Sequence, residues 1–322
     1  MYLALPAALL LALVWVAATG ADNGLAPVTP HSSNAESIRS TYWLILGITG
    51  AIFVIVETAL LLFVFRFRSR GHSRALEGAQ IHGATRLEMA WTIVPVLILA
   101  AIVSFVFVKL PSIKDVPPAT AGSKAINVRV EGHQYYWQFV YPDGQVSIKR
   151  LVVPVDQVVT IDIVSADVAH SFWAPALGGK TDAIPGRTNH TWFRADKTGS
   201  YEIRCAEFCG LEHAHMTGFV DVVNAAEYRR FLAAHKPPSP AIGKEITDGV
   251  CATCHGLAGQ GDYGPKIAGS PVVADPKGLE QLLRQGKNRM PAVGKTWSFD
   301  VMKAATDYLK RRYGGGASGS TS

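Results

Sequence analysis

Two long apolar stretches near the N-terminus constrain the fold of this chain more than any other feature. Tyr42–Phe65 is a stretch of about 24 residues with one charge, and Met89–Val108 is a stretch of about 20 with none. Each reaches the ~20 residues that a helix needs to cross a bilayer. Because lipid cannot satisfy backbone hydrogen bonds, we predict a two-helix transmembrane hairpin over residues 42–110.

The loop between the two stretches predicts the orientation of the hairpin. It carries five arginines against two glutamates, and positively charged loops stay in the cytoplasm. Everything after residue 110 is therefore expected on the outer side of the membrane. Glu57, an ionisable residue inside the first stretch, is expected to be functional or to pair with a neighbouring subunit, and we assign it no role.

A shorter apolar run precedes the hairpin. It covers residues 2–18 and ends at the small residues Ala18-Thr19-Gly20. This pattern favours a cleaved signal peptide over residues 1–20, although no lysine or arginine precedes the run. The alternative is a third membrane helix that the mature chain retains.

Residues 124–224 change to short runs with partial apolar–polar alternation. Turn signals such as Pro142-Asp-Gly144 and Pro185-Gly186 separate the runs. Regular short strands of this kind are typical of a β-sandwich or a Greek-key barrel, so we predict an all-β domain. The expected strands cover residues 125–130, 158–164, 188–193, 200–204 and 217–223.

The densest group of metal-binding side chains lies between two of these expected strands. Within twelve residues the chain places Cys205, Cys209, His213 and Met216. Copper prefers thiolate, thioether and imidazole ligands, and two cysteines four residues apart could bridge a pair of copper ions. His170 is the expected second imidazole. The spacing alone leaves a zinc site or a Cys205–Cys209 disulfide open.

A second cysteine pair follows a predicted helix and a stiff proline-rich linker, which together cover residues 225–242. Cys251-Ala-Thr-Cys254-His255 is the C-x-x-C-H signature of covalent haem c, in which both cysteines attach the haem and His255 is the proximal iron ligand. A thioredoxin-like redox pair would need a βαβ pattern, whereas this segment reads as helices between glycine-rich loops. We predict an all-α cytochrome c domain over residues 243–313 and a disordered tail over residues 314–322.

The sixth ligand of the haem iron is expected to be a methionine, which raises the reduction potential relative to a second histidine. Met290 precedes a proline in a loop that follows a predicted helix, whereas Met302 lies in a closing helix predicted over residues 299–312. We therefore predict Met290 as the axial ligand and Met302 as a core residue. The Gly264-Pro265 segment is expected to supply the carbonyl that orients His255.

Four motifs, in this order after a two-helix hairpin, resemble subunit II of haem–copper cytochrome c oxidases over about residues 40–225. They are His133-Gln-Tyr-Tyr-Trp137, His170-Ser-Phe-Trp-Ala-Pro175, Lys180-Thr-Asp-Ala-Ile-Pro-Gly-Arg187 and the Cys205–Met216 segment. The resemblance implies a cupredoxin fold with a binuclear copper centre, CuA. Its implied ligands are His170, Cys205, Cys209, His213, Met216 and the backbone carbonyl of Glu207.

The same resemblance implies roles for several acidic and basic side chains. The Glu207 carboxylate would bind a magnesium ion at the border with subunit I, and Glu88 would lie near the mouth of a proton channel. Asp182 and Arg187 match residues at the subunit I contact. The family has no metal ligand at the position of His215, so His215 is not expected to bind copper.

One position departs from that pattern. The family usually has Trp-Tyr-Trp after His-Gln, and the first Trp is the port through which cytochrome c delivers electrons; here that position holds Tyr135. Residues 124–236 also carry equal numbers of acidic and basic residues, without the acidic excess that attracts a basic cytochrome c. Both features favour electron entry through the haem domain. His133 and His190 are expected to be hydrogen-bonded structural histidines.

The segment around Met290 resembles the ligand loop of class I cytochromes c, and the whole chain resembles bacterial oxidases with cytochrome c fused to subunit II. This implies an electron-entry subunit of a proton-pumping oxidase in the bacterial inner membrane, partnered by subunits I and III and inactive alone. Its donor would be a cytochrome c or a cytochrome bc complex. The alternatives are an electron-input subunit of a nitric oxide reductase and a membrane-tethered electron carrier. Nucleic-acid binding is not expected, because the basic residues behind the net charge of +6 are scattered.

Overall fold

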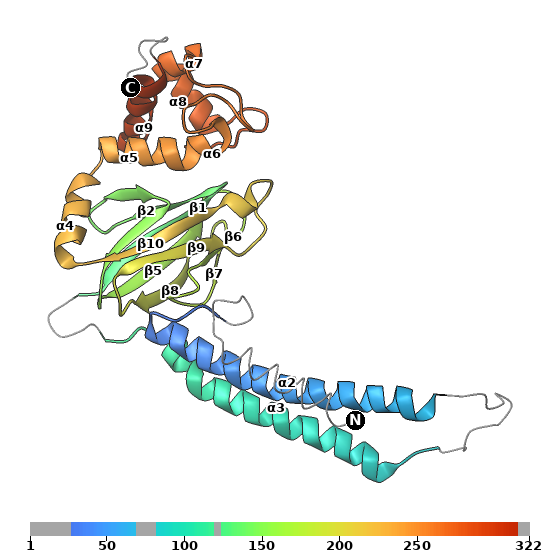
Figure 1. The fold of residues 1–322 in the computed structure, drawn as a ribbon. Helices are drawn as coiled ribbons and strands as arrows, with labels where there is room; N and C mark the ends of the chain where they lie inside the picture. The colour runs from blue at the N-terminus through green and yellow to red at the C-terminus, as the bar shows by residue number, and fades with distance from the viewer. Residues whose placement is uncertain (1–26, 69–81, 119–123, 315–322) are drawn as a thin grey trace. The chain divides into compact units, whose positions relative to one another are not determined.

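The computed structural model describes residues 27–68, 82–118 and 124–314 (Figure 1). The predicted signal peptide over residues 1–20 and residues 315–322 of the predicted tail lie outside the described residues. The chain divides into two compact units. One unit contains two long helices, and the other contains a β-sheet domain followed by a helical C-terminal region.

Both predicted membrane stretches are helical. Helix α2 spans Ser33–Phe67 and helix α3 spans Thr85–Lys114, and each is long and apolar enough to cross a membrane. The Ser112 hydroxyl donates to the Ser37 hydroxyl at 2.9 Å, which joins the last turn of α3 to the first turns of α2. Both helices are longer than the apolar stretches that predict them. Helix propagation adds a backbone hydrogen bond per residue, so each helix continues through the polar residues at both ends.

The β-sheet domain consists of two five-stranded sheets (Figure 1). In the first sheet, β1 pairs with β2 in antiparallel and with β5 in parallel orientation; in the second, β10 lies between parallel β4 and antiparallel β9. The first sheet contains, in order, β3 (Val146–Ile148), β2 (Tyr136–Val140), β1 (Ile126–His133), β5 (Val158–Ser165) and β8 (Asn189–Arg194). The second contains β4 (Arg150–Pro154), β10 (Thr217–Val223), β9 (Gly199–Cys205), β6 (His170–Trp173) and β7 (Thr181–Ala183). The predicted cupredoxin-like domain is confirmed.

All five predicted strands are present, as β1, β5, β8, β9 and β10. The sequence analysis does not predict the other five strands, because they are short or lack apolar–polar alternation. For example, β3 and β7 have three residues each, and β2 is buried along nearly its whole length. Inward-facing side chains of both sheets, such as Val128 and Val130 of β1 and Ile203 of β9, form one apolar core. That core fixes the strand ends at which the predicted metal ligands lie.

The helical C-terminal region begins with α4 (Ala225–Ala234), whose first N–H groups are capped by the Asn224 side chain. The helices that follow are α5 (Pro240–Ile246), the π-helical turn η3 (Thr247–Cys251), α6 (Ala252–His255), α7 (Pro271–Ala274), α8 (Pro276–Gln285) and α9 (Phe299–Tyr313). A second apolar core joins them and includes Ile242, Trp297 and Leu309. The prediction of a helical region after the β-sheet domain is confirmed.

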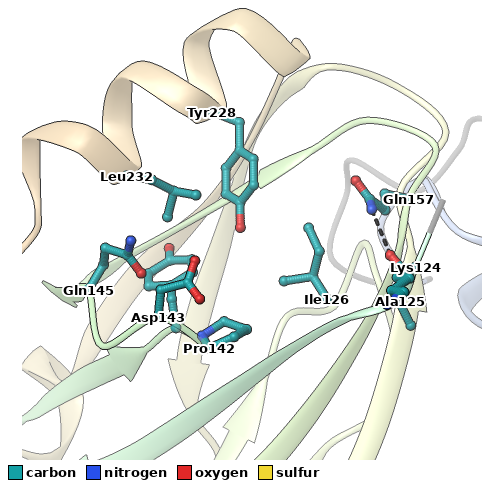
Figure 2. A pocket seen from close by; sticks show the side chains of 10 residues that line it. Lys124, Ala125, Ile126, Pro142, Asp143, Gln145, Gln157, Tyr228 and Leu232 are labelled. Carbon is teal, nitrogen blue, oxygen red and sulfur yellow. Dashed lines mark hydrogen bonds between the residues drawn. The ribbon is translucent and has the colours of Figure 1, made fainter.

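A pocket of about 300 Å³ lies between α4 and the β-sheet domain (Figure 2). Tyr228 and Leu232 of α4 line one side of it, and Ile126 lies on the other. The Gln157 side chain donates to the Lys124 carbonyl at 2.8 Å along its rim. Its lining includes no cysteine, histidine or methionine, so this pocket is separate from the predicted metal sites.

Candidate copper and haem sites

The predicted copper ligands meet at one end of the second sheet. Cys205 is the last residue of β9, and Met216 directly precedes β10, so the ligand loop, residues 206–215, leaves and re-enters the sheet at this end. His170 begins β6, which pairs with β9 so that Phe172 lies opposite Cys205. From the sequence, His170 is expected only to follow the predicted strand over residues 158–164. The structure shows that it opens a strand of its own, and the pairing of that strand brings it to the cysteines.

Four contacts connect the ligand side chains of this cluster. Cys205 Sγ lies 3.9 Å from Cys209 Sγ and 3.9 Å from His170 Nδ1. Cys209 Sγ lies 3.5 Å from His213 Nδ1 and 3.8 Å from Met216 Sδ. The two sulfurs therefore form the centre of the cluster, with one imidazole beside each of them.

The chemistry of this donor set fits copper. The Cys205 and Cys209 thiols are free, and their separation far exceeds the ~2.05 Å of a disulfide. The Glu207 carbonyl oxygen, 3.2 Å from Cys205 Sγ, and the Met216 thioether are weak ligands of the kind found beside thiolate and imidazole at copper electron-transfer sites. Structural zinc takes four strong nitrogen or sulfur ligands. Six donor groups, of which two are the shared cysteine sulfurs, suit two copper ions better than one zinc ion.

The neighbouring thiols of Cys205 and Cys209 shift each other's pKa in opposite directions. The hydrogen bond from Cys209 lowers the pKa of Cys205 to about 3, although burial acts in the opposite direction, and the contact with His170 lowers it further. The same Cys205–Cys209 contact raises the pKa of Cys209. Cys205 is therefore poised as a thiolate, the form of cysteine that binds metals.

Asp167 orients the His170 ring, and the sequence motifs do not single it out. His170 Nε2 lies 2.7 Å from Asp167 Oδ1, which leaves Nδ1 on the cysteine side. Burial lowers the pKa of His170, but the bond to Asp167 outweighs burial, and the pKa is raised. Carboxylates commonly orient metal-binding histidines in this way. An acidic residue three positions before a candidate histidine is the signal that could have found it.

Two neighbouring histidines are engaged elsewhere. His215 is exposed and its Nδ1 lies 2.6 Å from Glu212 Oε2, which agrees with its expected place outside the ligand set. His190 Nδ1 bonds to Asp162 Oδ1 at 2.7 Å, as expected for a structural histidine.

His133 lies beside the Glu131 carboxylate in the interior of the β-sheet domain. Its Nε2 lies 3.6 Å from Glu131 Oε2, beyond hydrogen-bonding distance, and this buried atom has no hydrogen-bond partner among the described residues. The ring instead stacks on Tyr136, with 4.6 Å between centroids. Stacking on Tyr136 and the contact with Glu131 together hold His133.

The predicted haem motif lies on η3 and α6. Cys251 ends η3, and Cys254 and His255 end α6, so about one helical turn separates the thiols. His255 Nδ1 donates to the Pro265 carbonyl at 2.6 Å, which confirms the expected carbonyl and leaves Nε2 for an iron ion. A Cβ at Gly264 would lie 2.8 Å from His255 Cε1, so glycine permits this close approach. The arrangement fits a c-type haem.

The thiols of the motif do not resemble a redox-active pair. Burial raises the pKa of Cys251 to about 12 and also raises the pKa of Cys254, whereas reactive C-x-x-C pairs have a lowered pKa. Within the described residues 225–314 the regular elements are helices, and the βαβ pattern of a thioredoxin-like fold is missing. Both observations argue against the thioredoxin-like alternative.

The two candidate axial methionines differ in position. Met302 lies in α9, 2% exposed, and is a core residue as predicted. Met290 lies between α8 and α9, half-buried against the same core, and its backbone forms a bridge with Lys287. Met290 therefore stays the predicted axial ligand.

Two other predicted site residues make contacts of their own. Glu88 Oε1 accepts the Ala84 N–H at 3.0 Å, so this carboxylate caps the start of α3. The Tyr135 hydroxyl accepts the Leu211 N–H at 3.2 Å, which places Tyr135 against the ligand loop. The Glu207 side chain is exposed beside the cluster.

The fold and the two sites together define a class of protein. Two apolar helices fit a membrane anchor, the cupredoxin-like domain carries a His–Cys–Cys cluster, and the helical region carries a haem-attachment motif. These features together fit the class of membrane-anchored electron-transfer proteins with copper and haem in one chain.

Comparison with known proteins identifies the family. Three family models match: the cytochrome c oxidase subunit II transmembrane domain over residues 27–109, its periplasmic domain over residues 145–223, and cbb3-type cytochrome c oxidase subunit III over residues 238–309. Cytochrome c oxidase subunit 2 of Alkalihalophilus pseudofirmus is 30% identical and covers 90% of this chain and 91% of its own length. The chain belongs to the cytochrome c oxidase subunit II family, with an additional cytochrome c domain.

A further relative and one solved structure match parts of this chain. Cytochrome c oxidase subunit 2 of Cereibacter sphaeroides is 33% identical over 59% of this chain and 74% of its own length. The crystal structure of the periplasmic domain of subunit II of cytochrome oxidase from Bradyrhizobium japonicum is 35% identical and covers 37% of this chain and 96% of that chain, with a TM-score of 0.35. Family membership implies CuA copper, haem, the oxidoreductase class and partner subunits such as subunit I.

Proposed function

We propose that this chain is the electron-entry subunit of a proton-pumping cytochrome c oxidase. Electrons would enter at a covalently bound haem c, continue to a binuclear CuA centre and leave for subunit I, where oxygen is reduced to water. The observation that carries this proposal is the presence, in one chain, of an oriented haem-attachment histidine and a preassembled cluster of two cysteines, two histidines and a methionine.

The β-sheet domain would hold the copper centre. Its proposed ligands are His170, Cys205, Cys209, His213, Met216 and the Glu207 carbonyl, all at or between strand ends. The β6–β9 pairing brings His170 to Cys205, and the hydrogen bond from His170 Nε2 to the Asp167 carboxylate orients the ring in advance. A preorganised ligand cage changes little when the charge of its metal changes. The contribution of this domain is thus rigidity at a redox centre.

The helical region would hold the haem. Cys251 and Cys254 would attach it covalently, and His255 and Met290 would bind the iron from opposite sides. The balanced charge of the copper domain and Tyr135 at the usual entry position support delivery of electrons to the haem region by a soluble or membrane-bound cytochrome donor.

The remaining assignments rest on the family. We propose residence in a bacterial inner membrane with subunits I and III, a magnesium ion on the Glu207 carboxylate, and proximity of Glu88 to a proton channel. The exposed Glu207 side chain beside the cluster and the apolar surfaces of α2 and α3 support this arrangement.

Purification of the intact membrane complex tests the proposal. We expect the complex to contain a haem–copper subunit I that consumes oxygen. Metal analysis of this chain, separated from subunit I, should give about two copper ions and one covalent haem per chain. Zinc in place of copper would contradict the copper assignment. A complex that consumes nitric oxide but not oxygen would contradict the oxidase assignment in favour of a nitric oxide reductase.

A further inference from the structure

Two consecutive residues of β2 enter different apolar cores. Trp137 lies in the core of the β-sheet domain, where its ring meets Phe172 edge-on at 5.3 Å and His170 at 6.0 Å between centroids. Tyr136 lies in the core of the helical region, together with Trp297. Because side chains alternate along a strand, β2 presents one aromatic ring to a predicted copper ligand and the next to the cytochrome region.

The Tyr136 hydroxyl makes two hydrogen bonds to the cytochrome region. It donates to the Val293 carbonyl at 2.6 Å and accepts from Trp297 Nε1 at 2.9 Å. Burial raises the pKa of Tyr136 well above its ordinary value, so the hydroxyl keeps the proton that it donates. The residue is 0% exposed, so water cannot replace either bond if the hydroxyl is removed.

The β-sheet domain fixes the other side of this ring. The His133 imidazole stacks on Tyr136 with 4.6 Å between centroids and 8° between planes. In the neighbouring strand β3, the Ile148 N–H donates to Glu245 Oε2 of α5 at 2.9 Å, which joins the same two regions a second time. Tyr136 is therefore held rigidly by one region and bonded to the other.

The segment that Tyr136 contacts directly follows Met290. Residues 291–298 are the second part of the connection from α8 to α9 and have no regular secondary structure. Other bonds from the helical region also hold this segment. The Gly294 N–H donates to the Leu283 carbonyl at 2.9 Å, and Arg284 Nη1 donates to the Gly294 carbonyl at 3.5 Å and to the Trp297 carbonyl at 3.3 Å. The two Tyr136 bonds add a connection from this segment to the β-sheet domain.

We propose that Tyr136 is a positioning residue. Through Val293 and Trp297 it fixes the Met290 loop against the β-sheet domain, so that methionine ligation of the haem iron depends on the copper-binding domain of the same chain. This inference rests on the proposed function, in which Met290 binds that iron. It gives the fused arrangement a structural role: the copper domain helps to build the haem site.

Tyr136→Phe in the full chain, with haem and copper bound, tests the proposal because it keeps the ring and removes the hydroxyl. The Gly294 and Trp297 amide hydrogens should exchange on the order of tenfold faster, since two buried hydrogen bonds are lost. The fraction of chains with the methionine–haem absorption band should fall. The electron paramagnetic resonance spectrum of the copper centre should stay unchanged.

Tyr141→Phe is the matched control. The Tyr141 hydroxyl, 2% exposed, donates to the Val152 carbonyl at 3.1 Å and accepts the Val152 N–H at 2.8 Å, both within the β-sheet domain. This variant should lose stability without changing exchange at Gly294 or the methionine–haem band. Unchanged exchange and an unchanged band in Tyr136→Phe, or equal changes in Tyr141→Phe, would overturn the proposal.

A double-mutant comparison sharpens the assignment. Trp297→Phe removes the indole donor, so Trp297→Phe and Tyr136→Phe each break the same hydrogen bond. The increase in the Gly294 exchange rate in the double variant should therefore be smaller than the product of the increases in the two single variants. Strictly multiplicative effects would mean that the Tyr136–Trp297 bond does not couple the two regions, against the proposal.

Failure of the proposed function would look different. A wild-type chain that binds haem without a methionine band, or that transfers no electron to copper, would contradict that function. The exchange rates of Gly294 in wild type, Tyr136→Phe and Tyr141→Phe would still show whether Tyr136 holds the loop.

Discussion

The copper cluster and the haem motif are built in opposite ways. The copper ligands come from β6, the end of β9 and the ligand loop, and the pairing of β6 with β9 brings His170 to within 3.9 Å of Cys205 although they are 35 positions apart. The haem motif lies within five consecutive residues on one helical segment. The first site depends on the global fold, whereas the second depends on a local motif and on covalent attachment.

Replacement of a central thiol should change the copper site most and leave the haem site intact. Cys209→Ser removes the sulfur that contacts Cys205, His213 and Met216, so copper content should fall from about two per chain to near zero while covalent haem stays at one. Metal analysis and the haem absorption spectrum measure both. His215→Gln, beside the cluster but bonded to Glu212, is the control and should keep its copper. Equal copper in the two variants would contradict the ligand assignment.

The two methionines of the haem region offer the second test. Met290→Ala should abolish the methionine–haem absorption band with little loss of stability, because Met290 is only half-buried. Met302→Ala should keep the band and lower the free energy of unfolding by roughly 2–5 kcal/mol, because it leaves a cavity in the core. Spectra and denaturant titrations separate the two effects. The reverse pattern would show that Met302 is the ligand.

Asp167 tests how far the copper site depends on groups outside its ligand set. Asp167→Asn should weaken copper binding about 10- to 100-fold, because the carboxylate that orients His170 is lost. Asp162→Asn removes the comparable bond to exposed His190 and serves as the control. Copper titration with a competing chelator measures both affinities. Equal affinities would mean that β6 alone fixes the imidazole.

The His235–Glu245 pair, which joins the end of α4 to α5, should show a smaller, pH-dependent effect. His235 Nδ1 lies 2.9 Å from the Phe231 carbonyl and Nε2 lies 2.9 Å from Glu245 Oε1, so both ring nitrogens face acceptors and the ring suits the charged form. Burial lowers the pKa of His235, but the bond to Glu245 outweighs it and raises the pKa above 6.5.

Because the folded-state pKa is raised, this contribution to stability is fully present below pH 6.5 and is lost as the pH rises through the folded pKa. We expect a loss of at most ~1–2 kcal/mol in the free energy of unfolding over that interval. His235→Gln should flatten the pH dependence in this window. A wild-type chain whose stability is constant from pH 6 to pH 8 would contradict the assignment.

The sequence predicts these regions to different extents, for physical reasons. The C-x-x-C-H motif, the long apolar stretches and the alternating strands are local patterns, and each appears where the sequence places it. The strand at His170 is missed because four residues show too little alternation, and Asp167 is missed because its role depends on the fold of the 166–169 turn. The Tyr136 bonds join residues 157 and 161 positions apart, and a single sequence carries no signal for such a pair.

The most direct test of the account is intramolecular electron transfer in the isolated full chain with haem and copper bound. A short pulse of reductant or light should reduce the haem, which should then be reoxidised as the copper absorption bleaches. We predict a first-order process whose rate is independent of protein concentration, because donor and acceptor belong to one chain. A haem that stays reduced beside oxidised copper, or a rate that rises in proportion to protein concentration, would contradict the proposal that this chain carries electrons from haem to copper.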